Sequence, residues 1–322
     1  MENITFTSFD TLCRVAFEKP ADTDGSALLV GVRGIANDVH SRLSMYDDRS
    51  ELSRLCQDYK PGAPIKVSEL LFEFLRRTLE ISRLSGGALD PTVAPYMRLW
   101  DYSSGHPKIP SDEALIEASH RIGWESIELG VGTITLHKSR MEIDPGASGK
   151  GYALDLAARY LRENGVQRGF IDFGGNLYAF GKRDHKEPWR VAIRHPDHAY
   201  QSLGVCHLEN MAIATSSWYE HCFSEGDQLC HHILDPRTGR PVSLKLKSVS
   251  IISSDAMLTD VLSTAVFVLG LEEGFALIDK VRAITKETIE YVIVSDDDCI
   301  HKSSGLSFMP EVQSDSANDR SK

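Results

Sequence analysis

The segment Asp144-Pro145-Gly146-Ala147-Ser148-Gly149-Lys150-Gly151 leads into a stretch whose pattern predicts a helix from about Tyr152 to Glu163, ended by Asn164-Gly165. Its glycines allow the backbone to approach a ligand closely, and a helix N-terminus attracts phosphate. It is not a Walker A loop, because Asp144 stands where the first glycine is required and Gly151 follows the lysine. It is not a G-x-S-x-G turn either, since Lys150 takes the last glycine position. A structural turn and a phosphate site, to which Lys150 would add positive charge, both remain open.

Apolar periodicity outside this segment predicts two more helices and several strands. Apolar residues recur at helical spacing over residues 67–84, with Ser68 as a suitable N-cap and Gly86-Gly87 as the signal that ends the helix. A third helix is expected to begin near Ser254-Asp255. Short runs of strand character are Thr133–Leu136, Gly169–Phe173, Trp189–Ile193, Ser248–Ile252 and Tyr291–Val294. Because strands and helices are interspersed without a βαβ rhythm, we expect an α+β protein with mixed, mainly antiparallel sheets.

The composition is that of a globular protein with an acidic balance. The 322 residues include 35 Lys and Arg against 46 Asp and Glu, which gives a formal net charge of −11. This sign argues against a nucleic-acid partner, whose phosphates need a basic face. It does not exclude a phosphate ligand, because a local site or a metal ion overrides the global charge. The length predicts either one large two-lobed unit or two domains.

The chain carries no signal for export or membrane insertion that we recognise. Its first residues lack the basic and apolar regions of a secretory leader, although a trimmed leader stays an alternative. No run approaches the roughly 18 apolar residues of a membrane span. The six cysteines form no C-x-x-C pair, which favours free thiols and a cytoplasmic location. Residues 313–322 are polar and are expected to form a disordered tail.

Two pairs of residues offer ligand chemistry. Asp260 and Thr264 lie four apart on the third predicted helix and hence on one face, and oxygen ligands of this kind suit Mg²⁺. A carboxylate that bonds neighbouring backbone is the equally good alternative. Gly174-Gly175 follows a predicted strand, where a glycine pair indicates either a bulge or the edge of a ligand site.

A histidine-rich turn and several aromatic residues leave more than one interpretation. Asp235-Pro236-Arg237-Thr238-Gly239 predicts a tight turn behind His231 and His232, and His232 could act as a general base or a phosphate donor. A zinc site with the nearby cysteines fits no common template. Tyr46 could stack on a ring ligand, while the surroundings of Asp90 and Trp100 could frame an aromatic pocket or fill a core.

The order of these signals along the chain is more specific than any one of them. Together they closely resemble the ApbE family, the flavin transferases, from about Phe6 to Val312. The matching segments are Phe9-Asp10-Thr11, Ser44-Met45-Tyr46, Ser50 to Leu55, Ser85 to Pro95, Leu99-Trp100, Asp144 to Asp155, Gly174-Gly175-Asn176, Ala214-Thr215-Ser216, His232 to Gly239 and Ala256 to Ala265. The resemblance implies one two-lobed unit over residues 1–312, with an FAD groove between the lobes.

The resemblance also implies an activity and a set of site residues. Family members use Mg²⁺ to transfer the FMN half of FAD to a Thr or Ser hydroxyl of an acceptor protein, and they release AMP. Some mainly hydrolyse FAD to FMN and AMP, and a flavin-binding protein without turnover is a further alternative. By position, metal ligands fall on the Ala147 carbonyl, Asp260 and Thr264, and the catalytic groups are His232, Asp260 and Lys150. FAD contacts fall on Thr11, Tyr46, Lys150, Gly174, Gly175, Thr215 and His232, with Asp90 and Asp155 on the adenosine side.

Four positions depart from the family's common pattern, and they lie at the rim of the expected flavin pocket. Asp10 stands where Gly is frequent, Cys56 where Asn is frequent, Asp172 where Asn is frequent and Ser217 where Gly is frequent. The metal pair and Lys150 are intact, which favours an active enzyme.

Overall fold

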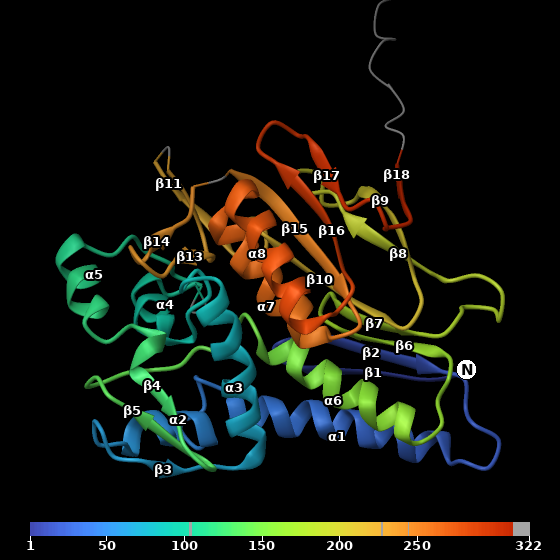
Figure 1. Cartoon of the computed structure of the whole chain (residues 1–322), viewed down its shortest axis with the longest axis horizontal. Helices are drawn as coiled ribbons and strands as arrows, with labels where there is room; N and C mark the ends of the chain where they lie inside the picture. Colours follow the sequence, from blue (N-terminus) through green and yellow to red (C-terminus); the bar gives the residue numbers. More distant parts are fainter. Residues whose placement is uncertain (103–104, 227, 244, 312–322) are drawn as a thin grey trace, which may run out of the picture.

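The computed structural model describes residues 1–102, 105–226, 228–243 and 245–311 of the chain. The predicted disordered tail, residues 313–322, lies outside these described residues. Helices and strands alternate irregularly along the chain, as the sequence predicted. Figure 1 shows the elements in sequence order from blue to red.

The centre of the fold is an eight-stranded sheet in which every neighbouring pair is antiparallel. In spatial order its strands are β1 (Glu2–Ser8), β2 (Thr11–Phe17), β6 (Gly169–Phe173), β7 (Asn176–Phe180), β10 (Met211–Ser217), β15 (Leu246–Ser253), β16 (Ile289–Ser295) and β17 (Ile300–Lys302). Neighbouring strands are mostly joined by hairpins or by helices that return over one face. This arrangement confirms the α+β class.

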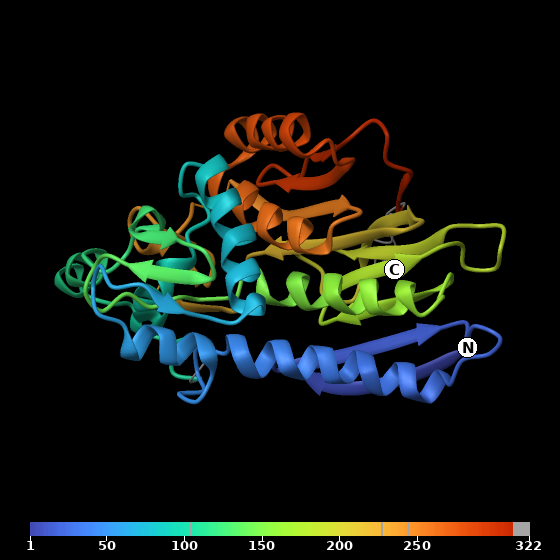
Figure 2. The same cartoon turned by 60° about the horizontal axis from the view of Figure 1, so that its bottom comes forward.

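The helices are α1 (Gly25–Leu43), α2 (Glu51–Asp58), α3 (Glu69–Leu84), α4 (Ala94–Trp100), α5 (Asp112–Ser119), α6 (Gly149–Glu163), α7 (Ala256–Leu269) and α8 (Leu271–Thr285), with the short 3₁₀ helices η1 (Pro91–Val93) and η2 (Trp124–Ser126). Of these, α1, α6, α7 and α8 pack against the central sheet. Figure 2 shows α1 and α6 running side by side next to β1 and β2. The apolar sides of α1, α3, α6 and α7 join the strands in the largest hydrophobic core. None of the helices in the described ranges is long and apolar enough to cross a bilayer.

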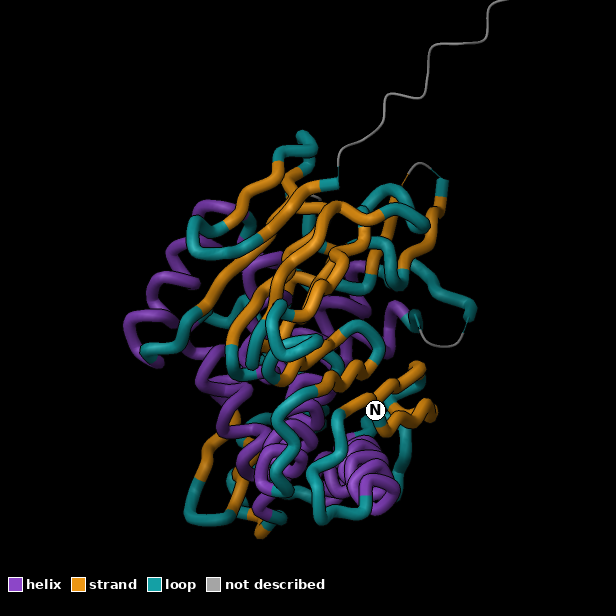
Figure 3. Tube along the Cα trace, turned by 90° about the vertical axis from the view of Figure 1, so that its right-hand side faces the viewer, coloured by secondary structure: helices purple, strands orange, loops and turns teal. Residues whose placement is uncertain are grey.

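A small three-stranded sheet covers part of the opposite face. It consists of β8 (Trp189–Arg194), β9 (Ser202–Leu208) and β18 (Phe308–Pro310), and a second core lies between the two sheets. Figure 3 shows the strands of both sheets together, with helices beside and beneath them. The remaining strands form small sheets away from this core: β3 (Ile65–Lys66), β4 (Ile127–Leu129), β5 (Thr133–Leu136), β11 (Cys222–Glu225), β12 (Gln228–His231), β13 (Leu234–Asp235) and β14 (Arg240–Pro241).

The three predicted helices and the five predicted strands all occur, and the predicted cap at Ser68 is confirmed. Ser68 begins α3 by accepting a hydrogen bond from the N–H of Leu71, and Asp255 caps α7 by accepting one from Leu258. The predicted turn after His232 joins β13 to β14. Helix α6 begins at Gly149, three residues before the predicted start, because two glycines belong to its first turn. A glycine-rich first turn has poor helix propensity, so its stability depends on tertiary contacts.

Candidate functional site

The candidate site is organised by the crossing of α6 and α7 at Gly151. A Cβ atom at this position would lie 2.6 Å from the Ala256 carbonyl oxygen and 2.7 Å from the Cβ of Asp260. Only glycine therefore lets the two helices approach this closely. The backbone N–H of Gly151 donates a hydrogen bond to Oδ2 of Asp260 at 2.9 Å. The glycine-rich segment thus places the first turn of α6 directly against a carboxylate of α7.

Asp260 is a buried acid with a local source of positive potential. Asp260 is only 7% exposed. Burial raises the pKa of its carboxyl group, whereas the charge of Lys150 and the hydrogen bond from the Gly151 N–H lower that pKa. The positive end of α6 also favours the anion. Lys150 follows directly after Gly149 at the start of the helix, so the helix end and the lysine both face this carboxylate. The site therefore concentrates positive potential in an acidic protein.

The three residues proposed as metal ligands fit a divalent cation such as Mg²⁺. Asp260 offers a carboxylate and Thr264, one turn further along α7, offers a hydroxyl 3.1 Å from Oγ of Ser216. Ala147 precedes α6, whose first helical hydrogen bond runs from the Tyr152 N–H to the Ser148 carbonyl at 3.0 Å, so the Ala147 carbonyl is not one of the regular acceptors of the helix. An all-oxygen set with one carboxylate is the donor chemistry that Mg²⁺ prefers.

Two hairpin turns lie together at one end of the central sheet. Phe9 and Asp10 join β1 to β2, and Gly174-Gly175 joins β6 to β7 with φ values of +62° and +94°. Because β2 pairs with β6, Thr11 lies against Gly174, where an added Cβ would be 2.4 Å from the threonine Cγ2. The glycine pair is thus a two-residue hairpin turn and not a bulge.

Lys150 connects these turns with the helix crossing. Burial raises the pKa of the Cys13 thiol in β2, and the charge of Lys150 opposes this rise. Lys150 also lowers the pKa of Asp260, as does Asn176, which follows the glycine pair. The structure therefore brings together Thr11, Gly174, Lys150 and Asp260, which are far apart in the sequence.

His232 directly follows β12 and carries a half-buried, neutral imidazole. Its backbone N–H donates to the carbonyl of His221 at 2.9 Å, and the two rings meet edge to face at 5.4 Å. Burial is the main cause that lowers its pKa to about 3, and nearby His221, His231 and Lys150 add to this effect. Its Nδ1 atom is buried and has no hydrogen-bond partner within the described part of the chain. A neutral ring with an available nitrogen near Lys150 suits proton transfer.

The structure gives Asp90 and Asp155 internal partners. Asp90 is the N-cap of η1 and accepts hydrogen bonds from the N–H and the hydroxyl of Thr92. It also accepts a hydrogen bond from the N–H of Trp124. Asp155 accepts from two N–H groups at the start of α7 and pairs with Arg77. These contacts favour structural roles for both carboxylates, and their contact with adenosine stays a prediction.

The other predicted contacts lie on separate elements. Tyr46 is in the loop between α1 and α2 and is 62% exposed. Thr215 on β10 shares a hydrogen bond of 2.8 Å with Ser250 of β15, while its neighbour Ser216 points to α7. The side chains of Thr215 and Ser216 thus lie on opposite faces of the sheet. Their roles toward a flavin stay predictions.

The zinc alternative finds no support in the described residues. Within them, no three His, Cys, Asp or Glu side chains are arranged to hold a metal ion. All six cysteines are free thiols, as the sequence predicted.

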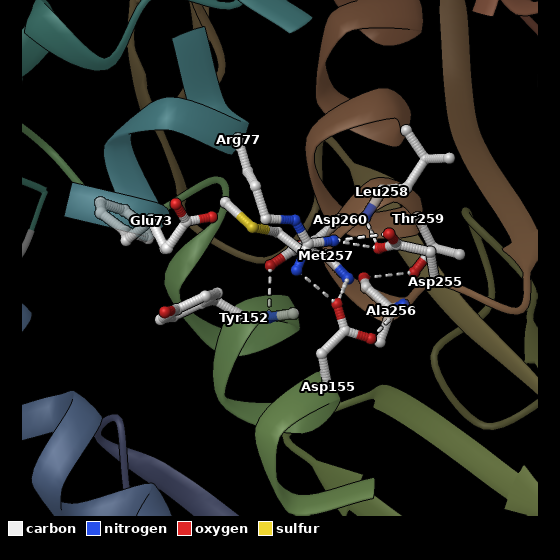
Figure 4. A network of polar contacts seen from close by, with 12 residues as sticks. Glu73, Arg77, Tyr152, Asp155, Asp255, Ala256, Met257, Leu258, Thr259 and Asp260 are labelled. Carbon is white, nitrogen blue, oxygen red and sulfur yellow. Dashed lines mark hydrogen bonds and ion pairs between the residues drawn. The ribbon is translucent and has the colours of Figure 1, made fainter. Parts of the chain in front are cut away.

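The sequence interpretation missed Arg77 and the pairing of Asp255. Arg77 of α3 reaches both Asp155 and Asp255, as Figure 4 shows. A signal was present, because Arg77 follows Phe74 by three positions, close to the apolar side of an amphipathic helix. A largely covered arginine there requires acidic partners.

Comparisons with known proteins give the same relationship from independent data. The family model described as the ApbE family matches residues 9–289. A Vibrio cholerae protein named FAD:protein FMN transferase is 29% identical, covering 91% of this chain and 87% of that protein. A Haemophilus influenzae protein of the same name is 31% identical, covering 77% and 74%. The solved structure of the flavin transferase ApbE from Vibrio cholerae superimposes with a TM-score of 0.81 at 27% identity, covering 94% of this chain and 97% of the other. The chain belongs to the ApbE family.

Proposed function

We propose that this protein is an Mg²⁺-dependent FAD:protein FMN transferase, which moves FMN from FAD to a Thr or Ser hydroxyl of an acceptor protein and releases AMP. The names of the relatives support flavin transfer to a protein. The observation that carries the proposal is the buried Asp260 carboxylate held at the N-terminus of α6 beside Lys150. This arrangement suits a ligand that brings both a divalent cation and a diphosphate.

The residues divide the binding of FAD by charge. A diphosphate resists attack until its negative charge is neutralised, and Mg²⁺ held by the Ala147 carbonyl, Asp260 and Thr264 would supply that neutralisation. The Lys150 ammonium would bind phosphate oxygens, and the positive end of α6 would favour their negative charge. The hairpin turns at Asp10 and Gly175, where Gly175 has no atom within 4 Å of an added Cβ, leave backbone exposed for the flavin end.

His232 would orient and deprotonate the acceptor hydroxyl. The hydroxyl oxygen attacks the phosphorus of the FMN half, the bond to the AMP phosphate breaks, and the proton passes to the unprotonated ring nitrogen. AMP leaves with the electron pair of the broken bond. A pKa of about 3 keeps the ring unprotonated in the free protein, and the negative charge of the bound FAD diphosphate would raise this pKa toward the range in which the ring accepts a proton. We place the reaction in the cytoplasm as part of the same proposal, which the six free thiols support.

The test incubates the protein with FAD, Mg²⁺ and an acceptor flavoprotein domain co-expressed from the same genome. We expect intact-mass spectrometry to show an acceptor heavier by one FMN, together with stoichiometric AMP. Release of AMP and free FMN from FAD alone at the same rate would instead indicate an FAD pyrophosphatase. Tight FAD binding without AMP under either condition would indicate a flavin-binding protein and would contradict the proposal.

A further inference from the structure

At the crossing of α6 and α7, each helix has a carboxylate that accepts hydrogen bonds from backbone N–H groups of the other helix. Asp260 of α7 accepts from the Gly151 N–H of α6, while Asp155 of α6 accepts from the N–H groups of Ala256 and Met257 of α7 at 2.7 and 3.1 Å. In α6 the donor lies four residues before the acceptor, and in α7 the two donors lie four and three residues before it, so donors and acceptor share one face of each helix. These reciprocal hydrogen bonds therefore fix the position of α7 along α6.

Arg77 of α3 binds two carboxylates at the N-terminus of α7, beside these reciprocal hydrogen bonds. Its Nη1 atom lies 2.9 Å from Oδ2 of Asp155, and its Nη2 atom lies 2.5 and 2.6 Å from the two oxygens of Asp255. Asp255 is itself the N-cap of α7 and accepts from Leu258 at 2.8 Å. Figure 4 shows the guanidinium pointing between the two carboxylates. One planar cation thus connects three helices.

The charges make Arg77 necessary for this geometry. The side chains of Arg77, Asp155 and Asp255 are 20%, 13% and 33% exposed, so water screens them only in part. Each carboxylate raises the pKa of Arg77, which means that both stabilise its positive charge. Without the guanidinium, two partly buried carboxylates would repel one another beside the same helix end. The start of α7 would then shift or rotate to separate them.

A shift at the start of α7 changes the candidate metal site. Asp260 lies one helical turn after Ala256, the first residue of α7, and the close backbone contact at Gly151 leaves no slack for independent adjustment. Any movement of Ala256 therefore moves the Asp260 carboxylate and the Thr264 hydroxyl relative to the Ala147 carbonyl, which belongs to the segment before α6.

We propose that Arg77 is a positioning residue for the divalent cation: by binding Asp155 and Asp255 together, it sets the register of α6 and α7 at which Asp260, Thr264 and the Ala147 carbonyl converge. The proposal rests on the proposed function for the identity of the cation site. It assigns Arg77 no contact with FAD, the cation or the acceptor. Residues that orient metal ligands in this way typically contribute 10–100-fold, by order of magnitude, to metal affinity.

The experiment compares Arg77→Met with Arg76→Met. Both substitutions remove one positive charge from the same part of α3, but the Arg76 side chain is 47% exposed, and its ion pairs among the described residues are with Glu73 and Glu80 of its own helix. Mn²⁺ serves as the probe, and its binding to the full chain is measured by electron paramagnetic resonance without FAD or acceptor. The Mg²⁺ concentration for half-maximal FMN transfer and the rate at saturating Mg²⁺ are measured in parallel.

We expect Arg77→Met to weaken Mn²⁺ binding by about 10–100-fold and to raise the half-maximal Mg²⁺ concentration by a similar factor, with much of the rate recovered at saturation. Arg76→Met should bind Mn²⁺ like the wild type. Unchanged Mn²⁺ affinity in folded Arg77→Met would overturn the inference.

Arg77→Lys covers the case in which Arg77→Met does not fold. Lysine keeps the charge but cannot hold both carboxylates with a planar fork. Near-ultraviolet circular dichroism checks the fold, and we expect an intermediate Mn²⁺ affinity. A folded Arg77→Lys that binds Mn²⁺ as tightly as the wild type would also overturn the inference. Failure of the wild type to flavinylate any acceptor would instead count against the proposed function, because Mn²⁺ binding is measured without it.

Discussion

The Oδ2 atom of Asp260 accepts a hydrogen bond of 2.9 Å from the backbone N–H of Gly151, although 109 residues separate the two in the sequence. The close approach at this contact explains why the first turn of α6 has glycine at position 151, where a lysine-bearing phosphate loop would carry Ser or Thr. It also explains how an acidic protein holds one carboxylate in a region of positive potential. Five predictions test this contact and the rest of the candidate site.

Gly151→Ala should destabilise the protein and disturb the site. The added methyl would lie 2.6 Å from the Ala256 carbonyl oxygen, and backbone atoms of two packed helices cannot move away cheaply. We expect a loss of about 1–3 kcal/mol in the free energy of unfolding, measured by urea denaturation. Gly149→Ala is the matched control, since its methyl would meet only Pro145 Cβ at 3.5 Å and should cost little. Equal stability of the two variants would contradict this account of the helix crossing.

Asp260→Asn should abolish Mg²⁺-dependent FMN transfer while it keeps the fold. The amide oxygen can still accept the Gly151 N–H, so the helix contact survives, but the anionic ligand is lost. Because burial raises the pKa of Asp260, a neutral side chain should leave thermal stability equal or higher. AMP release and FAD binding by flavin fluorescence are the measurements, and we expect binding to be kept in part. Turnover near the wild-type rate would remove Asp260 from the metal site.

His232→Gln should reduce FMN transfer by about 10²–10⁴-fold, because general-base catalysis contributes about that much. Burial lowers the pKa of His232 to about 3, so the wild-type rate should show no loss of activity from this ring as the pH falls from 7 to 5. A rate that falls tenfold per pH unit with a midpoint near 6.5, absent from the variant, would show an ordinary imidazole at this position.

The same pKa shift predicts how stability depends on pH. The unfolded ring takes up a proton near pH 6.5, whereas the folded ring resists protonation until about pH 3. Between these values the unfolded state binds more protons, so the contribution of His232 is complete above pH 6.5 and is lost as the pH falls toward 3. Urea denaturation at several pH values should show a smaller acid loss in His232→Gln than in the wild type. Parallel curves for the two proteins would contradict the assignment.

Asp10→Gly should stabilise the protein. Phe9 and Asp10 form a two-residue hairpin turn with φ values of +51° and +53°, a conformation that glycine adopts without strain. Asp10 is exposed, and we expect a gain of about 1 kcal/mol, measured as a higher urea midpoint at constant slope. Gly175→Ala is the reverse control: φ is +94° with open space around it, so strain alone should lower stability. A destabilised Asp10→Gly would mean that the carboxylate makes a contact worth more than the strain.

The fold and the site differ in how far the sequence predicts them. The caps at Ser68 and Asp255, the strand of residues 169–173 and the turn after Asp235 all depend on residues within a few positions of one another. Such interactions survive in any tertiary setting, which is why local patterns predicted them. The start of α6 was predicted too late because its first turn is stabilised by Asp260, a partner that no local pattern contains.

The sequence by itself determined the family, three of the helices and five of the strands, and the residues that offer oxygen ligands and a positive charge. Only the tertiary structure decided that Asp155 binds the start of α7 and that Arg77 joins it to Asp255, over separations of 78 and 178 residues. The physical reason is the cost of burying charge: a carboxylate in a partly dry contact must find a cation or N–H donors, and which ones it finds depends on how helices cross. Glycine at position 151 permits that crossing, but its meaning appears only when the opposing helix is in place.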